Sequence, residues 1–172
     1  MNNYITSLIN QFDYYKTAGD KTLQQLSFNE MNYQLHDNSN SVSIIVKHMV
    51  GNMLSRWTNF YSEDGEKDWR KRDTEFYESS KNKEELKNHW EKGWNCLFTI
   101  IDNLKENDLT KIIKIRNENH TVVEAINRQL AHYPFHIGQL IYIGKMMKDN
   151  QWESLSIPKN KSEEFNKTKF NS

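Results

Sequence analysis

Four long stretches of this chain carry apolar residues at alternating intervals of three and four positions. This spacing places the apolar side chains along one face of an α-helix. The stretches cover residues 3–26, 41–60, 83–104 and 121–148, while only the segment 112–115 hints at a β-strand. Amphipathic helices of this length bury their apolar faces by packing against one another. The sequence therefore predicts an all-α protein built as a four-helix bundle.

Two of the predicted helices begin with residues that cap helix N-termini. Ser41 precedes the second stretch, and its hydroxyl can accept a hydrogen bond from the free backbone N–H groups of the first turn. Thr121 precedes the fourth stretch with Glu124 three positions later, which is the spacing of a capping box. These signals indicate where the second and fourth helices begin.

Length and connections indicate one domain. A chain of 172 residues fits a single domain, residues 1–172, that buries about two thirds of the surface of its unfolded form. The connections Tyr61–Asn82 and Lys105–His120 are long enough to cross over an end of the bundle, so we expect them to roof it. The tail after Lys148 contains Pro158 and few apolar residues, which predicts an irregular C-terminal strap with a mobile end.

Charge and cysteine content exclude several functional classes. The chain has 23 basic and 23 acidic residues, so no global field attracts nucleic acid or an anionic membrane. No apolar run approaches the roughly 20 residues that span a bilayer, and the N-terminus lacks the basic start and apolar core of a signal peptide. Cys96 is the single cysteine, which excludes an internal disulfide and suits a reducing compartment. We expect a cytoplasmic protein whose partners include neither nucleic acid nor a membrane.

Two histidines four positions apart, His132 and His136, are the strongest indication of a functional site. At about 3.6 residues per turn, their imidazoles leave one face of the fourth helix, close enough to bind one metal ion. His48 lies at the edge of the apolar face of the second helix and can face them. Three neutral imidazoles would bind a divalent ion and leave positions open for water or substrate. The spacing alone is equally consistent with histidines that are hydrogen-bonded at a helix interface.

Pro134 lies between the two histidines. Proline removes the helical hydrogen bond to the carbonyl of Leu130 and would separate the histidines if the helix began there. The apolar pattern runs unbroken from Ile126 to Met147, so we predict one continuous helix with a kink.

Polar residues beside the histidines are candidates to orient them. Gln139 lies one turn beyond His136, and Asn52 lies one turn beyond His48, where an amide can hold a ligand or a metal-bound water. An alternative role for each is that of a polar residue at the bundle edge. Three weaker candidates are Gln129, Arg128 and the capping residue Glu124.

The segment GEKDWRKRDTEFY combines cationic and aromatic side chains. At the mouth of a pocket, Trp69, Arg70 and Arg72 would receive a small molecule that carries a carboxylate or a thiol. Asp68, Asp73 and Glu75 alternate with these bases. The alternative is therefore a loop that is folded down by its own aromatic anchors and ion pairs.

Four segments carry a resemblance to a known family: HTVVEAINRQLAHYPFHIGQLIYIGKMM, SVSIIVKHMVGNMLSRW, DWRKRDTEF and WESLSIPKNKSEEFN. They resemble the DinB-like superfamily, and more closely its branch of small bacterial proteins of unassigned function. The resemblance implies a four-helix bundle, often a homodimer, with a divalent metal ion, commonly nickel, zinc or iron, held by three histidines. By motif position these would be His48, His132 and His136.

The resemblance also orders the functional hypotheses. Some members of the superfamily are thiol-dependent transferases, so the leading hypothesis is a metal-dependent transferase or detoxifying enzyme that acts on a small molecule with a low-molecular-weight thiol. A metal-dependent hydrolase is the first alternative, but it needs a general base, and no acid lies between Gln129 and Ile143. The second alternative is a non-enzymatic bundle that binds a metal or small ligand and dimerises.

Overall fold

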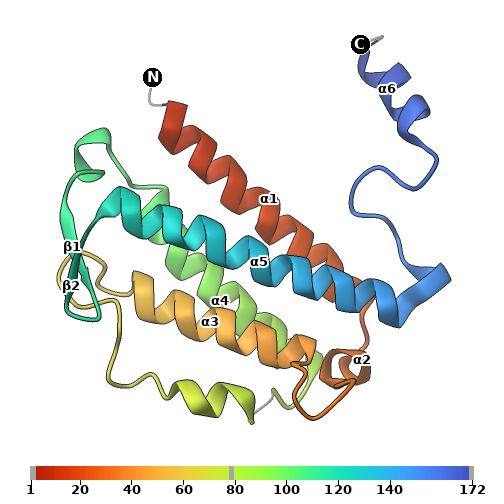
Figure 1. The fold of residues 1–172 in the computed structure, drawn as a ribbon, viewed down its shortest axis with the longest axis horizontal. Helices are drawn as coiled ribbons and strands as arrows, with labels where there is room; N and C mark the ends of the chain where they lie inside the picture. Colours follow the sequence, from red (N-terminus) through yellow and green to blue (C-terminus); the bar gives the residue numbers. More distant parts are fainter. Residues whose placement is uncertain (1–2, 78–79, 171–172) are drawn as a thin grey trace.

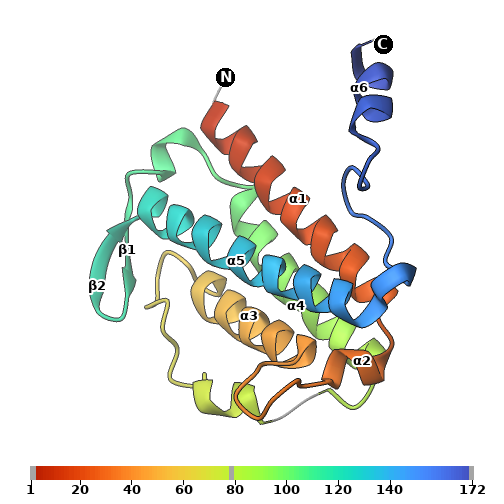
Figure 2. The ribbon, with the colours of Figure 1, turned by 45° about the vertical axis from the view of Figure 1, so that its right-hand side comes forward.

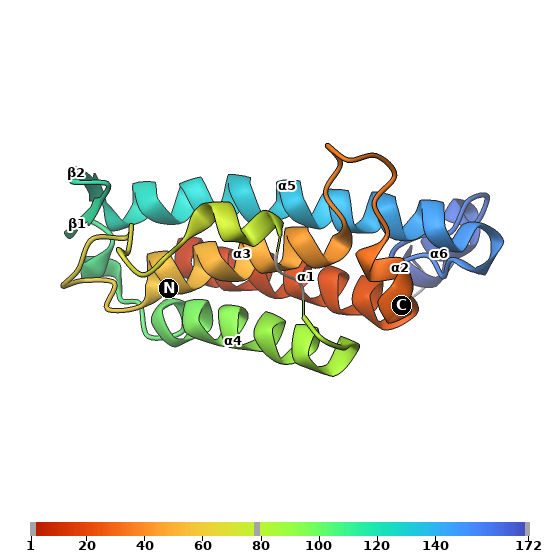
Figure 3. The same ribbon diagram turned by 90° about the horizontal axis from the view of Figure 1, so that it is seen from below.

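Four long helices dominate the structure, a computed structural model that describes residues 3–77 and 80–170. They are α1 (Asn3–Gln25), α3 (Val42–Trp57), α4 (Lys83–Ile101) and α5 (Val122–Lys148). The four lie side by side (Figure 1), and a view from below places α4 and α5 at opposite edges (Figure 3). The predicted all-α class is confirmed. No helix among the described residues has the length and apolar character needed to cross a bilayer.

Shorter elements occupy the connections. The short helix α2 (Phe28–Asn32) was not predicted, although Ser27 and Glu30 form a capping box at its start. Strand β1 confirms the strand indicated by the sequence, and a second strand pairs with it. The two strands are β1 (Ile112–Ile115) and β2 (Glu118–Thr121). Three short 3-10 helices also occur: η1 (Arg72–Phe76), η2 (Glu106–Asp108) and η3 (Asp149–Gln151).

Both predicted caps are present. The Oγ of Ser41 accepts a hydrogen bond from the backbone N–H of Ile44 at 3.2 Å. Thr121 and Glu124 form the reciprocal capping box, and the carboxylate of Glu124 accepts from the backbone N–H of Thr121 at 2.7 Å. Helix α5 runs through Pro134 without interruption, which confirms its predicted continuity. All residues of α5 therefore keep their helical spacing.

Helices α3 and α4 each end three residues earlier than predicted. At the end of α3, Thr58 leaves the helical region with ψ 127°, and Asn59 follows with φ 50°. Phe60 is nevertheless buried, and its ring packs 5.0 Å from that of Trp57. An apolar residue in the turn after a helix thus continues the apolar pattern without continuing the helix.

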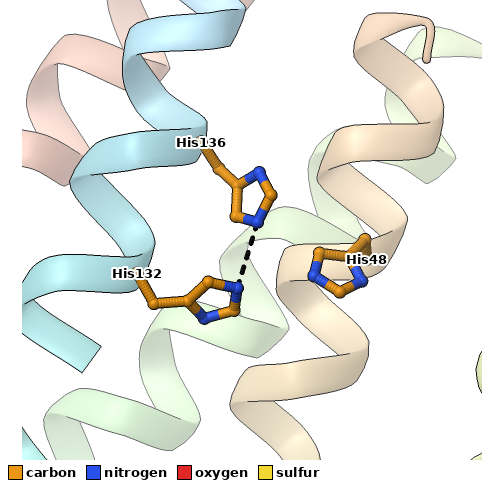
Figure 4. A group of neighbouring side chains, drawn as sticks. All are labelled: His48, His132 and His136. Carbon is orange, nitrogen blue, oxygen red and sulfur yellow. Dashed lines mark hydrogen bonds between the residues drawn. The ribbon is translucent and has the colours of Figure 1, made fainter. Parts of the chain in front are cut away.

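Aromatic side chains form the centre of the core. Phe12, Trp94 and Tyr133 are fully buried, and the Tyr133 ring lies 6.2 Å from Phe12 and 6.0 Å from Trp94. Tyr133 therefore fixes the rotation of α5 about its own axis. His132, the preceding residue, is turned toward α3 as a result (Figure 4).

Two connections meet at one end of the bundle. The hairpin of β1 and β2 turns at Arg116 and Asn117, which have φ values of 55° and 61°. The carboxylate of Asp64 accepts hydrogen bonds from both backbone N–H groups, at 2.8 Å and 2.6 Å. Next to it, the N–H of Gly65 donates to the carbonyl of Lys114 at 2.8 Å. The segment after α3 and the hairpin are thus joined to each other beside the start of α5 (Figure 1).

The C-terminal tail departs from the prediction in its last part. Between η3 and residue 161 it is irregular, and Glu153 forms two hydrogen bonds with Gln25, at 2.8 Å and 3.2 Å. The prediction of an irregular strap is wrong for Ser162–Phe170, which form helix α6. An acidic first turn and a basic last turn suit the helix dipole there. Helix α6 is exposed and stands away from the bundle (Figures 1 and 2).

Candidate metal centre

Helices α3 and α5 bring the three predicted histidines together (Figure 4). The Nε2 atoms of His132 and His136 are 3.0 Å apart. The ring of His48 approaches from α3, with its centroid 4.9 Å from that of His136 and 5.6 Å from that of His132. One nitrogen of each ring lies within 4.8 Å of the other two. The geometry of three side chains from two helices is that of a candidate metal site.

A hydrogen bond at Nδ1 orients each ring. Carboxylate and amide oxygens accept hydrogen bonds, so each Nδ1 donates its proton to the acceptor beside it. The partners are Oε2 of Glu75 for His48 (2.8 Å), Oε1 of Gln129 for His132 (3.3 Å) and Oε1 of Gln139 for His136 (2.8 Å). Such outer partners fix the tautomer and direction of a metal-binding imidazole.

The donor atoms fit a divalent ion. The 3.0 Å between the Nε2 atoms of His132 and His136 is short enough for both to bind one ion. Two imidazole nitrogens come into such close contact only with a proton or a metal cation between them. Burial lowers the pKa of His132 to about 4, and it also lowers the pKa of His136. Both rings are therefore neutral near pH 7, in the form that binds metal ions.

Glu75, which the sequence did not predict as a site residue, contacts His48 directly. It is 4% exposed, and Arg70 donates to its carboxylate from Nε at 2.8 Å and from Nη2 at 3.2 Å. Burial raises the pKa of Glu75, but the hydrogen bonds from His48 and Arg70 outweigh it and hold the pKa below its usual value. A permanent negative charge therefore lies behind His48.

Glu75 reaches His48 because residue 51 is glycine. A Cβ built at Gly51, on α3, would overlap Oε1 of Glu75. The connection is held in place by Lys47, whose Nζ donates to the carbonyl of Thr74 at 2.8 Å. No spacing rule links Glu75 to His48 across 27 positions. The signal that could have found it is the DWRKRDTEF segment, which is part of the family resemblance.

Among the described residues, no side-chain hydrogen bond joins Asn52 to any of the three histidines. Its Oδ1 accepts a hydrogen bond at 3.1 Å from Tyr133, whose own hydroxyl oxygen accepts from Nε1 of Trp57 at 3.0 Å. Burial raises the pKa of Tyr133, so the hydroxyl keeps its proton and donates. Asn52 is thus fixed by the core. Gln139, by contrast, bonds to a candidate ligand directly.

A cavity of about 220 Å³ opens beside His48 and His132. Two of the three residues predicted to bind substrate, Arg70 and Arg72, line it. Trp69 lies outside this lining, and its side chain is 54% exposed. The site therefore combines three converging imidazoles with a neighbouring cavity.

Comparison with family models matches residues 1–161 to the family described as a protein of unknown function, DUF1572. The match covers all four long helices and the three histidines. No curated protein matches the sequence. The DUF1572 description does not mention the DinB-like superfamily, so that relationship stays a prediction from the motifs.

Proposed function

This chain belongs to the DUF1572 family, and we propose that its three histidines bind one divalent metal ion in the active site of an enzyme. One observation carries the proposal. Three imidazoles converge while an oxygen acceptor holds every Nδ1. A purely structural histidine cluster does not need three rings that are each oriented through Nδ1 toward one point. Nickel, zinc and iron all accept such ligands, so the residues do not select one of them.

The remaining residues support the three ligands and the substrate. The carboxylate of Glu75 makes His48 a stronger donor, and the amides of Gln129 and Gln139 hold the other two rings. Because the cavity borders His48 and His132, a small molecule bound there lies beside the ligands. The chain thus provides both a place for an ion and a place for a substrate.

A thiol-dependent transferase or detoxifying activity is the reaction that the DinB-like resemblance favours. When bound, a divalent ion lowers the pKa of a thiol in an open position and supplies a thiolate at neutral pH. The sulfur forms a bond with an electrophilic carbon of the substrate as the bond from that carbon to its leaving group breaks. The leaving group departs with the bonding electrons, and the thiol proton passes to solvent.

A hydrolase is the weaker alternative because it lacks a free general base. Among the residues that the structure describes, no carboxylate lines the cavity. Both carboxylate oxygens of Glu75 are already engaged by His48 and Arg70. A base must be free to take a proton from water.

The proposal is tested with protein made without an affinity tag. Elemental analysis should find about one nickel, zinc or iron ion per chain, as expected for one set of three imidazoles. The loaded protein should accelerate conjugation of bacillithiol or glutathione to an electrophile. Failure to bind any of these metals would contradict the metal site.

The same experiment distinguishes the alternatives. Metal binding without acceleration across several thiols would contradict the transferase and favour a non-enzymatic metal-binding bundle. A coordination sphere closed by a fourth protein ligand would favour that bundle as well. The homodimer implied by the resemblance stays a prediction, and light scattering on the same sample measures it.

A further inference from the structure

All five arginines of the chain line the cavity beside the histidines. They come from four separate places in the fold: α3, the segment after it, the hairpin turn and α5. The lining contains no lysine, although lysine is the more abundant basic residue of the chain. The five residues are Arg56, Arg70, Arg72, Arg116 and Arg128. Residues so far apart in sequence meet here only because the fold brings them together.

The carboxylates around the cavity do not neutralise this charge. Glu66 pairs with Arg56 at 3.2 Å and with Arg116 at 3.1 Å. Glu75 pairs with Arg70. Five guanidinium groups thus have two carboxylate partners between them. The remaining arginines, residues 72 and 128, form no ion pair with any residue that the structure describes.

Arg56, which also lines the cavity, has one buried donor atom that no described residue satisfies. Its side chain is 5% exposed, yet its Nε is a buried donor without a hydrogen-bond partner in the described structure. Its other nitrogens donate to the carbonyl of Gly65 and to Glu66. A buried charged donor left unpaired destabilises a protein unless a ligand or water satisfies it.

Arginine is the side chain suited to oxyanions. Its planar guanidinium donates two parallel hydrogen bonds to a carboxylate or phosphate, which a lysine ammonium cannot do. The volume of about 220 Å³ is below the roughly 300–1,000 Å³ of pockets for drug-sized ligands. It therefore suits a small anion or the anionic end of a larger molecule.

We propose that this arginine-lined cavity binds an oxyanion group, a carboxylate or a phosphate, beside the three-histidine site. Arg72 and Arg128 supply the charge that the described carboxylates leave unpaired, and Arg56 adds a third guanidinium group to the lining. Anion binding itself does not depend on the proposed function. Only the further step, in which the bound anion is part of the substrate, rests on that function. That substrate is then an anionic small molecule whose reactive end lies toward His48 and His132.

Calorimetric titration with orthophosphate and with succinate, at low ionic strength, tests the cavity. The full chain is first freed of metal with phenanthroline, a chelator without carboxylates. Wild-type protein should bind at least one of the two anions with one site per chain. Arg128→Gln and Arg72→Gln should each weaken binding about tenfold or more, because each removes a charged hydrogen-bond donor. Preference for phosphate or for succinate identifies the chemical group.

Lys145→Gln is the matched control, since it removes one positive charge from the exposed face of α5 outside this cavity. It should leave the affinity unchanged. Binding of neither anion, or equal weakening by Lys145→Gln, would overturn the inference. Because the titration needs no metal, either result leaves the proposed metal site intact. Conversely, anion binding by a protein that takes up no metal would sustain this inference alone.

Discussion

Helix α3 packs against α4 and against α5 in two different ways. Toward α4 the contact is apolar and close: a Cβ added at Gly93 would stand 3.1 Å from Sδ of Met53 and 3.2 Å from Cα of Val50. Toward α5 it is polar, with His48 facing two histidines and Asn52 bonded to Tyr133. One helix therefore gives stability from its apolar face and binding from its polar face. Substitutions in the two interfaces should have separable effects.

The largest expected effect is at the polar interface. His136→Ala removes one of the three proposed metal ligands. Metal affinity should fall more than about 100-fold, because losing a ligand costs more than losing its hydrogen-bond partner. His136 is only partly buried, so the unfolding free energy of the metal-free protein should change by less than about 1 kcal/mol. Titration with zinc and urea denaturation measure the two quantities. His89→Ala, at an exposed histidine outside the site, should retain wild-type affinity.

Met53→Ala should have the opposite pattern. Met53 is fully buried against α4, and its truncation leaves a cavity that should lower the unfolding free energy by about 2–5 kcal/mol. Metal affinity of the folded protein should stay at the wild-type value. Circular dichroism in urea gives the first quantity. A large loss of metal affinity at temperatures where the variant is folded would show that the two interfaces are coupled.

Glu75→Gln tests the charge behind His48 at constant shape. We expect metal affinity to fall about 10–100-fold, as for other outer partners of metal-binding histidines. Glu63→Gln is the control in the same connection, because it removes a carboxylate paired only with Lys67 and Asn59. Equal losses in the two variants would assign the effect to net charge and contradict a specific role for Glu75.

Gly51→Ala should give the smallest effect. The added methyl group overlaps Oε1 of Glu75 and pushes this carboxylate from His48, so we expect metal affinity to fall about threefold to tenfold. Alanine favours a helix over glycine by roughly 0.5–1 kcal/mol, which offsets the strain in stability. Gly138→Ala, where a Cβ meets nothing within 4 Å, should leave affinity unchanged. An unchanged affinity in Gly51→Ala would argue against the contact between Glu75 and His48.

Local spacing explains what the sequence could predict. The positions of the long helices, the cap at Ser41 and the capping box at Thr121 all follow from residues a few positions apart. The pairing of His132 with His136 has the same origin, since both lie on one helix. Helix α2 was not predicted because five residues are too few to show the helical spacing of apolar side chains. Its capping box, Ser27 with Glu30, is visible in the sequence.

Contacts between distant segments explain what the sequence could not predict. Glu75 meets His48 only because the connection after α3 folds back along that helix. Arg116 and Arg128 come to one cavity from a hairpin turn and a helix, and no periodic pattern relates them. Composition did not indicate these arginines either. A net charge of zero gives no information on where the positive charges lie in the fold.

The hydrogen bonds of Asp64 have a consequence for engineering selectivity. They tie the segment after α3 to the hairpin turn, so a change of length in one would displace the other. The imidazole ligands stand on long helices that would not follow such a displacement. To change which small molecule the protein binds, the segment after α3 and the hairpin should therefore be replaced together. The four long helices should be left unchanged.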